Sequence, residues 1–132
     1  GSYVADQVTK LMIKKRIQVV DANILIMGFT FKENCPDIRN SKVFDLVTEL
    51  KEYNCKVDIY DPWVDNYRAK DEYNLSLINE PELGKYDAII LAVAHEEFKQ
   101  LTSQEVRSYG KDLSIIFDIK FLFNESEVDG RL

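Results

Sequence analysis

The chain has 132 residues, with 17 lysines and arginines against 23 aspartates and glutamates, and a formal net charge of −6. At this length we expect a single domain that buries enough apolar surface to fold without disulfides or a structural metal. The acidic balance argues against nucleic acid or an anionic membrane as the main partner, because both are bound through clustered lysines and arginines.

The sequence indicates neither a membrane anchor nor a metal site. The longest apolar runs, such as Ala88 to Ala94, fall far short of the ~20 residues that span a bilayer, and no secretory signal is visible. Cys35, Cys55 and the single histidine, His95, do not have the spacing of a zinc site. We therefore expect a cytoplasmic protein in a reducing environment.

The first two residues, Gly1 and Ser2, are typical of the scar that protease cleavage leaves on an expressed protein. We accordingly assign residues 1–2 to a tag and expect the chain to be a fragment of a larger protein.

Apolar runs alternate with amphipathic patterns along the chain, and this alternation divides it into strands and helices. In chain order, the predicted elements are a helix over 3–16, a strand over 23–29, a loop over 30–40, a helix from Asn40 or Ser41 to about residue 54, a strand over 55–60, a weakly helical or irregular segment over 63–79, a strand over 86–93, short helices over 96–100 and 103–109, and a strand over 113–118. Strands that are near-continuous apolar runs are typical of a parallel sheet covered on both faces. We therefore predict an α/β fold, a Rossmann-like three-layer sandwich with a mostly parallel sheet, preceded by an N-terminal helix.

The loop after the first strand is the strongest candidate for a binding site. Ligands of open α/β sheets bind outside the carboxyl ends of the strands. A strand-to-helix loop in such folds usually takes ~2 to 6 residues, whereas the segment over 30–40 takes eleven. Long loops of this kind often carry function.

The composition of this loop suits an anion such as a phosphate. Lys32 and Arg39 supply positive charge, and neutral donors lead into a helix N-terminus; these donors are Asn34, Asn40 and Ser41. Lys120, which follows the last predicted strand, should face the same edge of the sheet. The alternative for Lys32 and Arg39 is local ion pairing with the neighbouring acidic residues Glu33 and Asp37, and the sequence leaves the two readings about even.

A dinucleotide-binding fingerprint is absent. The first strand-to-helix turn contains only Gly28, no G-x-G-x-x-G occurs anywhere, and Asp61 after the second strand is a weak signal without those glycines. We therefore expect this domain not to bind NAD in the Rossmann mode.

Four further positions have competing interpretations. Cys35 has no histidine near it in sequence, which favours a loop or packing thiol over a nucleophile. His95 precedes two glutamates, which favours a solvated or capping residue. One of Phe29 and Phe31 should lie in the core, while the other is available as a platform for a base. Trp63 is either a surface anchor or a lid over the core.

Four segments together resemble a known family. The segments cover residues 28–42, 57–64, 91–98 and 117–120, and their order is similar to that in the C-terminal, UDP-binding domain of the UDP-glucose/GDP-mannose dehydrogenase family. The resemblance extends from about residue 3 to the chain end, including residues 128–132. The Glu-Asn-Cys-Pro-Asp-Ile-Arg-Asn version of the first segment is most similar to the branch that oxidises UDP-N-acetylhexosamines (GlcNAc or GalNAc), as in Vi-antigen and O-antigen biosynthesis.

The resemblance implies a parent enzyme with three parts. An N-terminal Rossmann domain binds NAD, a central helical region carries the catalytic cysteine and the dimer contact, and the present domain binds the UDP-sugar. The parent oxidises the sugar C6 alcohol to a carboxylate in two NAD-dependent steps, through a thiohemiacetal and a thioester on that cysteine. Residues 3–19 would be the end of the inter-domain helix, and residues 20–132 the UDP-sugar-binding domain. No catalytic residue is then expected in this fragment, which should be inactive alone.

The resemblance also implies roles for individual residues. Phe31 and Lys32 match a pair that contacts the uridine and sugar side of the ligand, and Lys120 matches a basic residue that helps to hold UDP. Arg39 matches an arginine that reaches toward the NAD and active-site cleft. Cys35 does not match the catalytic thiol.

Two other functions compete with this one. The apolar face of the first helix suits an assembly module that dimerises and binds no ligand. A receiver-like signalling domain would need an acidic pair after the first strand and an aspartate after the third, where this chain has Thr30-Phe31 and Ala94-His95.

Overall fold

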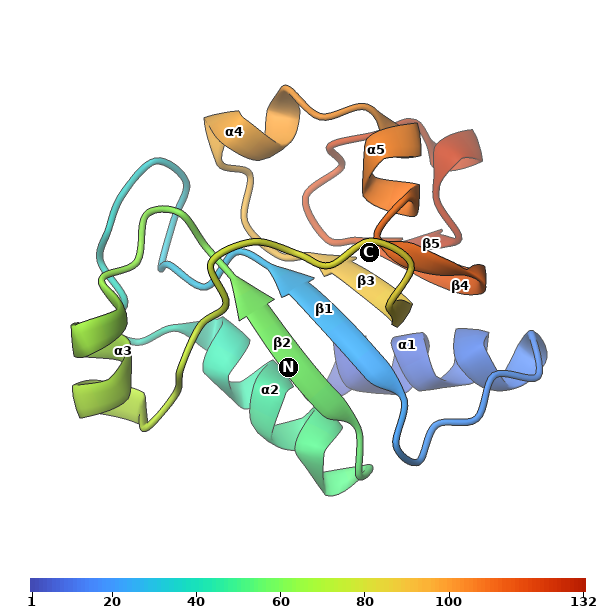
Figure 1. Cartoon of the computed structure of the whole chain (residues 1–132), viewed down its shortest axis with the longest axis horizontal. Coiled ribbons are helices and arrows are strands. Elements are labelled where there is room, and N and C mark those ends of the chain that lie inside the picture. The colour runs from blue at the N-terminus through green and yellow to red at the C-terminus, as the bar shows by residue number, and fades with distance from the viewer.

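Five parallel strands form the centre of the protein, and the computed structural model describes all residues from 1 to 132 (Figure 1). The strand order is β2-β1-β3-β4-β5, with every neighbouring pair parallel. The strands are β1 (Asn23–Met27), β2 (Lys56–Tyr60), β3 (Tyr86–Leu91), β4 (Gly110–Asp118) and β5 (Gly130–Arg131).

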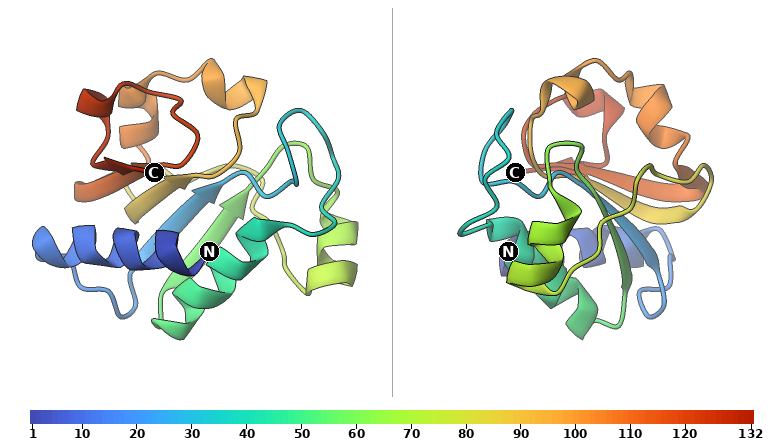
Figure 2. Two further views of the ribbon diagram at one scale, coloured as in Figure 1. Left: turned by 180° about the vertical axis from the view of Figure 1, so that it is seen from behind. Right: turned by 60° about the vertical axis from the view of Figure 1, so that its left-hand side comes forward.

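Helices cover both faces of this sheet. They are α1 (Ser2–Lys14), α2 (Lys42–Glu52), α3 (Asn66–Tyr73), α4 (Glu96–Lys99), α5 (Ser103–Arg107) and a 3-10 turn, η1 (Glu125–Glu127). Figure 2 shows α1 and α2 together across one face, with α4, α5 and η1 on the other. The predicted three-layer α/β sandwich is therefore confirmed, and its sheet is entirely parallel.

The two faces of the sheet bury alternate residues of the same strands, as the period of a strand requires. One core joins α1 and α2 to the strand residues Ile24, Ile26, Ala88, Ile90, Ile115 and Phe117. The other joins α4 and α5, through Phe98 and Val106, to Leu25, Met27, Ile89, Leu91 and Ile116. Because α1 supplies four fully or nearly fully buried residues to the first core, it is an integral layer of the fold; they are Val4, Ala5, Val8 and Met12.

The structure corrects several predicted boundaries. The weakly patterned segment over 63–79 contains α3, whose N-cap Asp65 accepts a hydrogen bond from the Tyr67 amide. The last predicted strand begins earlier, at Gly110, and its pairing with β3 is irregular between Gly110 and Ile115. The two-residue strand β5 was not predicted, because two residues are too few to show a strand period. None of the helices combines the length and apolar character that a membrane crossing requires.

The carboxyl ends of four strands lie in one row. Met27 is in register with Tyr60 and with Leu91, and Leu91 is in register with Asp118. The loops that follow β1, β2, β3 and β4 therefore leave the sheet side by side at a single edge. This is the edge at which open parallel sheets bind their ligands.

Gly28 begins the first of these loops, and its position requires glycine. Its φ is +104°, and a Cβ there would lie 2.6 Å from the Cβ of Val93. No other residue could adopt this backbone without displacing the segment that follows β3.

Candidate functional site

A pocket of about 320 Å³ opens at this edge of the sheet. Its walls come from the first loop, the start of α2, the segments after β3 and β4, and the first turn of α1. The lining residues are Gly1, Val4, Thr30, Phe31, Lys32, Glu33, Lys42, Val43, Leu46, Ala92, Val93, Ile119 and Lys120. Three of the residues predicted to bind the ligand thus meet at one cavity, namely Phe31, Lys32 and Lys120.

The pocket combines an apolar wall with a positively charged rim. Three lysines line it, Lys32, Lys42 and Lys120, against the single carboxylate of Glu33. None of the three ammonium groups forms an ion pair within the chain. Lys42 did not stand out in the sequence because it falls inside a helical pattern. Its place at the first turn of α2 brings it to the same rim.

Arg39 behaves differently from Lys32. Its guanidinium binds Asp37 through two bonds, Nε to Oδ1 at 3.0 Å and a terminal nitrogen to Oδ2 at 2.9 Å. This pair lowers the pKa of Asp37 to about 2, chiefly through the side-chain hydrogen bond. Local pairing, the alternative that the sequence left open, therefore applies to Arg39 and not to Lys32. Arg39 does not line the pocket, and its side chain is largely exposed.

The two phenylalanines beside Thr30 are divided as predicted. Phe29 is fully buried and packs edge-on against Tyr73, with ring centroids 5.3 Å apart. Phe31 is 56% exposed and lines the pocket. One ring therefore belongs to the core, and the other is free to contact a ligand.

Two residues expected to donate to a phosphate serve the loop instead. The hydroxyl of Ser41 donates to the Phe29 carbonyl at 2.7 Å, and Ser41 is buried. The side-chain oxygen of Asn34 accepts the Glu96 amide at 2.9 Å. The prediction that Ser41 donates to a ligand was wrong, because its hydroxyl stabilises the folded path of the loop. Asn34 does not line the pocket.

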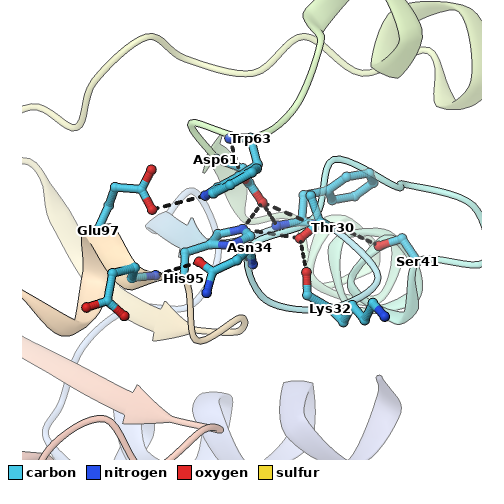
Figure 3. Close-up of polar contacts among 10 residues, drawn as sticks. Thr30, Lys32, Asn34, Ser41, Asp61, Trp63, His95 and Glu97 are labelled. Atoms are coloured by element: carbon cyan, nitrogen blue, oxygen red, sulfur yellow. Dashed lines mark hydrogen bonds and ion pairs between the residues drawn. The ribbon is translucent and has the colours of Figure 1, made fainter.

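Below the loop lies a buried polar network that the sequence did not predict (Figure 3). Asp61 accepts the amides of Phe29 and Thr30 on Oδ2, at 2.7 and 3.1 Å, and lies 2.9 Å from Nε2 of His95. His95 is fully buried, so the solvated alternative was wrong. It does occupy the N-cap position of α4, although its side chain forms no capping hydrogen bond there. The signal that could have revealed the pair is its placement, since Asp61 follows β2 and His95 follows β3 at the same edge.

Trp63 closes this network from outside. Its ring stacks on His95 at 5.9 Å between centroids and 24° between planes, and its Nε1 donates to Glu97 at 3.0 Å (Figure 3). Of the two interpretations that the sequence allowed, the structure favours the lid.

A second buried carboxylate supports the other side of the pocket. Asp118, at the end of β4, is fully buried and accepts the amides of Lys120 and Phe123 at 3.2 and 2.9 Å. Between these two amides, Phe121 adopts a φ of +57°, which is uncommon for a bulky residue. The turn that presents Lys120 is therefore built around Asp118.

Cys35 lies half-buried in the first loop as a free thiol. The structure brings together no group of three or more His, Cys, Asp or Glu side chains that could hold a metal ion.

Comparison with known proteins places this geometry in a family. The sequence model described as "UDP-glucose/GDP-mannose dehydrogenase family, UDP binding domain" matches residues 25–125. Two relatives described as UDP-N-acetyl-D-glucosamine 6-dehydrogenase match the whole chain, one from Salmonella typhi at 49% identity and one from Pseudomonas aeruginosa at 50%. The chain spans 31% of the length of each.

Solved structures agree with the fold. A UDP-D-ManNAc dehydrogenase from Pyrococcus horikoshii superposes with a TM-score of 0.78 at 23% identity, over 98% of this chain and 30% of that one. The UDP-N-acetyl-mannosamine dehydrogenase Cap5O from Staphylococcus aureus superposes at 0.70 and 25% identity, over 98% and 29%. The chain belongs to the UDP-glucose/GDP-mannose dehydrogenase family, and it is the UDP binding domain of that family.

Proposed function

We propose that the pocket at the carboxyl edge of the sheet binds the UDP part of a UDP-sugar, with Lys32, Lys42 and Lys120 at the diphosphate and Phe31 against the uracil. The observation that carries this proposal is the meeting of three lysines without ion-pair partners at the rim of a half-apolar cavity. A charge-assisted hydrogen bond contributes about 1.5 to 3 kcal/mol. Two or three such bonds are enough to hold a diphosphate in a chain of net charge −6.

The remaining walls fit the organic part of such a ligand. The exposed ring of Phe31 offers a face for stacking, and aromatic stacking on a nucleobase contributes about 1 to 3 kcal/mol. Val43, Leu46, Val93 and Ile119 supply an apolar floor. The cavity volume lies at the lower end of the range for small-molecule sites.

In the whole protein, this domain would serve an NAD-dependent UDP-N-acetylhexosamine 6-dehydrogenase of surface polysaccharide biosynthesis, acting in the cytoplasm as a homodimer or larger homo-oligomer. Identity of 49–50% to two UDP-N-acetyl-D-glucosamine 6-dehydrogenases supports this assignment. Residues 3–19, within which α1 ends at Lys14, would contain the end of the inter-domain helix, and residues 20–132 would hold the nucleotide sugar. Arg39, exposed outside the pocket, would face the cleft between this domain and the NAD-binding one.

NAD itself would be held elsewhere in the whole protein. The first strand-to-helix connection carries only Gly28, and Val93 closes the space above it, so no glycine-rich cradle for a dinucleotide forms there. The chain's own contribution to the reaction is to bind and orient the UDP-sugar.

Isothermal titration calorimetry of UDP against the wild-type chain and Lys32→Ala tests the proposal. We expect binding by the wild type and an affinity about tenfold lower for the variant, because one charge-assisted bond is lost. Lys51→Ala is the matched control, since Lys51 lies in the last turn of α2 and outside the pocket. An absence of heat with the wild type would contradict the proposal and favour an assembly module.

A further inference from the structure

One buried pair, Asp61 and His95, holds the first loop on both sides of Lys32 (Figure 3). We propose that these two are positioning residues for nucleotide binding: they fix the loop so that Lys32 stands at the pocket, and they do so only while His95 is neutral with its proton on Nε2. The inference rests on the proposed function, because UDP-sugar affinity is one of its readouts.

Asp61 holds the start of the loop. Its Oδ2 accepts the amides of Phe29 and Thr30, and its Oδ1 accepts the Trp63 amide at 2.8 Å. The Asp61 side chain is fully buried, and no lysine or arginine pairs with it. Three backbone donors converge on it, so it ties the end of β1 to the end of β2.

His95 holds the loop beyond Lys32. Its Nδ1 lies 3.0 Å from the backbone nitrogen of Asn34. A backbone amide can only donate, so Nδ1 accepts and carries no proton. The ring proton therefore sits on Nε2, where it faces Asp61 Oδ2 at 2.9 Å and Thr30 Oγ1 at 3.2 Å. Nδ1 thus accepts from one donor, and the proton on Nε2 is shared between two acceptors.

Lys32 lies between these two points of attachment. The Thr30 hydroxyl donates its proton to the Lys32 carbonyl at 2.9 Å. The hydroxyl oxygen of Thr30 can therefore only accept from His95. The Lys32 side chain is exposed and forms no ion pair, so its position depends on the backbone that carries it. The link from His95 to Lys32 therefore passes through Thr30 and Asn34.

A proton added to Nδ1 would remove this link. Three carboxylates lie near His95: Asp61 at the end of β2, and Glu96 and Glu97 on α4, of which Glu97 accepts a hydrogen bond from Trp63. Its uncharged neighbours are Thr30, Asn34, Trp63 and Phe98. Asp61 faces Nε2, whereas Nδ1 faces only the Asn34 amide. Protonation would place an N–H of the ring against the backbone N–H of Asn34, so this hydrogen bond would break and the loop would lose one attachment. Affinity for the nucleotide should therefore fall as the pH is lowered.

The first test measures affinity for UDP-N-acetylglucosamine from about pH 7.5 down to about pH 5.5. In this ligand both phosphates are esterified, so its charge does not change over that range. We expect the wild-type affinity to fall several-fold on acidification. His95→Gln keeps a donor for Asp61 and loses the acceptor for Asn34, so it should bind about tenfold more weakly at the upper pH, with no pH dependence. Glu97→Gln, the control, should keep the pH dependence of the wild type.

A double-mutant cycle separates positioning from simple destabilisation. If His95 acts through Lys32, His95→Gln should have little further effect on affinity in a Lys32→Ala background. Equal effects of His95→Gln in both backgrounds would overturn the proposal.

NMR of the ligand-free chain distinguishes a failure of this inference from a failure of the proposed function. The ¹⁵N spectrum of His95 should show a protonated Nε2 and an unprotonated Nδ1 near neutral pH. On acidification the Asn34 amide should lose protection against hydrogen exchange, measured relative to its intrinsic exchange rate at each pH. If these signatures appear without any UDP binding, the proposed function fails while the loop attachment stands. A proton on Nδ1 near neutral pH would overturn the inference, whether or not the variants fold.

Discussion

The buried carboxylate of Asp118 accepts the backbone amide of Lys120 at 3.2 Å and so holds in place the residue whose ammonium group lines the pocket. Asp61 does the same for the loop that carries Lys32. The ends of β2 and β4 thus share one arrangement, a buried aspartate that accepts backbone amides of a loop carrying one of the lysines.

Asp118→Asn is expected to lower the free energy of unfolding by about 1 to 3 kcal/mol, because the NH2 group that replaces one carboxylate oxygen cannot accept a backbone amide in a fully buried site. Urea denaturation measures this change. Asp112→Asn, at an exposed position of the same strand, should alter stability by no more than about 0.5 kcal/mol. Similar losses in the two variants would show that Asp118 has no special part in the turn.

Lys42→Ala should weaken UDP binding by about three- to tenfold, since Lys42 stands at the pocket rim and has no ion-pair partner within the chain. Because the attraction is electrostatic, the difference from the wild type should shrink at high salt. Calorimetry at low and high ionic strength provides the measurement. An affinity unchanged at low salt would remove Lys42 from the site.

Phe31→Leu should reduce affinity for UDP by about fivefold or more through lost stacking on the base. The affinity for inorganic pyrophosphate, which has no base, should be the same in the variant and in the wild type. Phe121→Leu is the matched control, because Phe121 is exposed to a similar degree, 54% against 56%, but does not line the pocket. If Phe31→Leu weakened the binding of pyrophosphate and of UDP by the same factor, or if Phe121→Leu weakened UDP binding as much as Phe31→Leu, the ring of Phe31 would not contact the uracil.

The Asp37 carboxyl should titrate well below an ordinary aspartate, with a pKa of about 2, because Arg39 donates to it through both its side chain and its backbone. A lowered pKa means that the pair contributes stability above the ordinary aspartate range, and that this contribution disappears as the pH falls from about 4 toward 2. NMR titration of the carboxyl carbon measures the value. In Arg39→Gln the pKa should rise toward the ordinary value, and an unchanged pKa would contradict the pairing.

Gly28→Ala should cost about 2 to 5 kcal/mol of unfolding free energy, since it adds both an unfavourable backbone conformation and a clash with Val93. Gly84→Ala shares the positive φ but has nothing within 4 Å of the added Cβ, so it should cost only about 1 kcal/mol. Thermal or urea unfolding compares them. An equal loss of unfolding free energy in the two variants would mean that the segment around Val93 moves aside at little cost.

The sequence alone was sufficient to predict much of the fold and part of the site, for one physical reason. Parallel strands place their carboxyl ends at one edge, so the loops after β1 and β4 had to meet, and with them Phe31, Lys32 and Lys120. The apolar runs of β1 and β3 are continuous because both faces of the sheet are covered, and this made them easy to recognise.

The features that escaped prediction depend on tertiary structure. Nothing local distinguishes a buried His95 from a solvated one, because its burial follows from Trp63 and Phe98 closing over it. Ser41 and Asn34 have the composition of ligand donors, and only the folded path of the loop shows that they bind the backbone. Lys42 lies in a helical pattern whose orientation toward the pocket the pattern does not specify.

The aspartates at the ends of β2 and β4 have a mechanical consequence. They engage the amides of Phe29, Thr30, Lys120 and Phe123, so these amides are not available to grip a phosphate. Charge at the rim comes instead from long, flexible lysine side chains on a backbone that is itself well tethered. In such a site the ammonium groups can adjust to the position of the ligand, while the backbone at the edge of the sheet is held by its own hydrogen bonds.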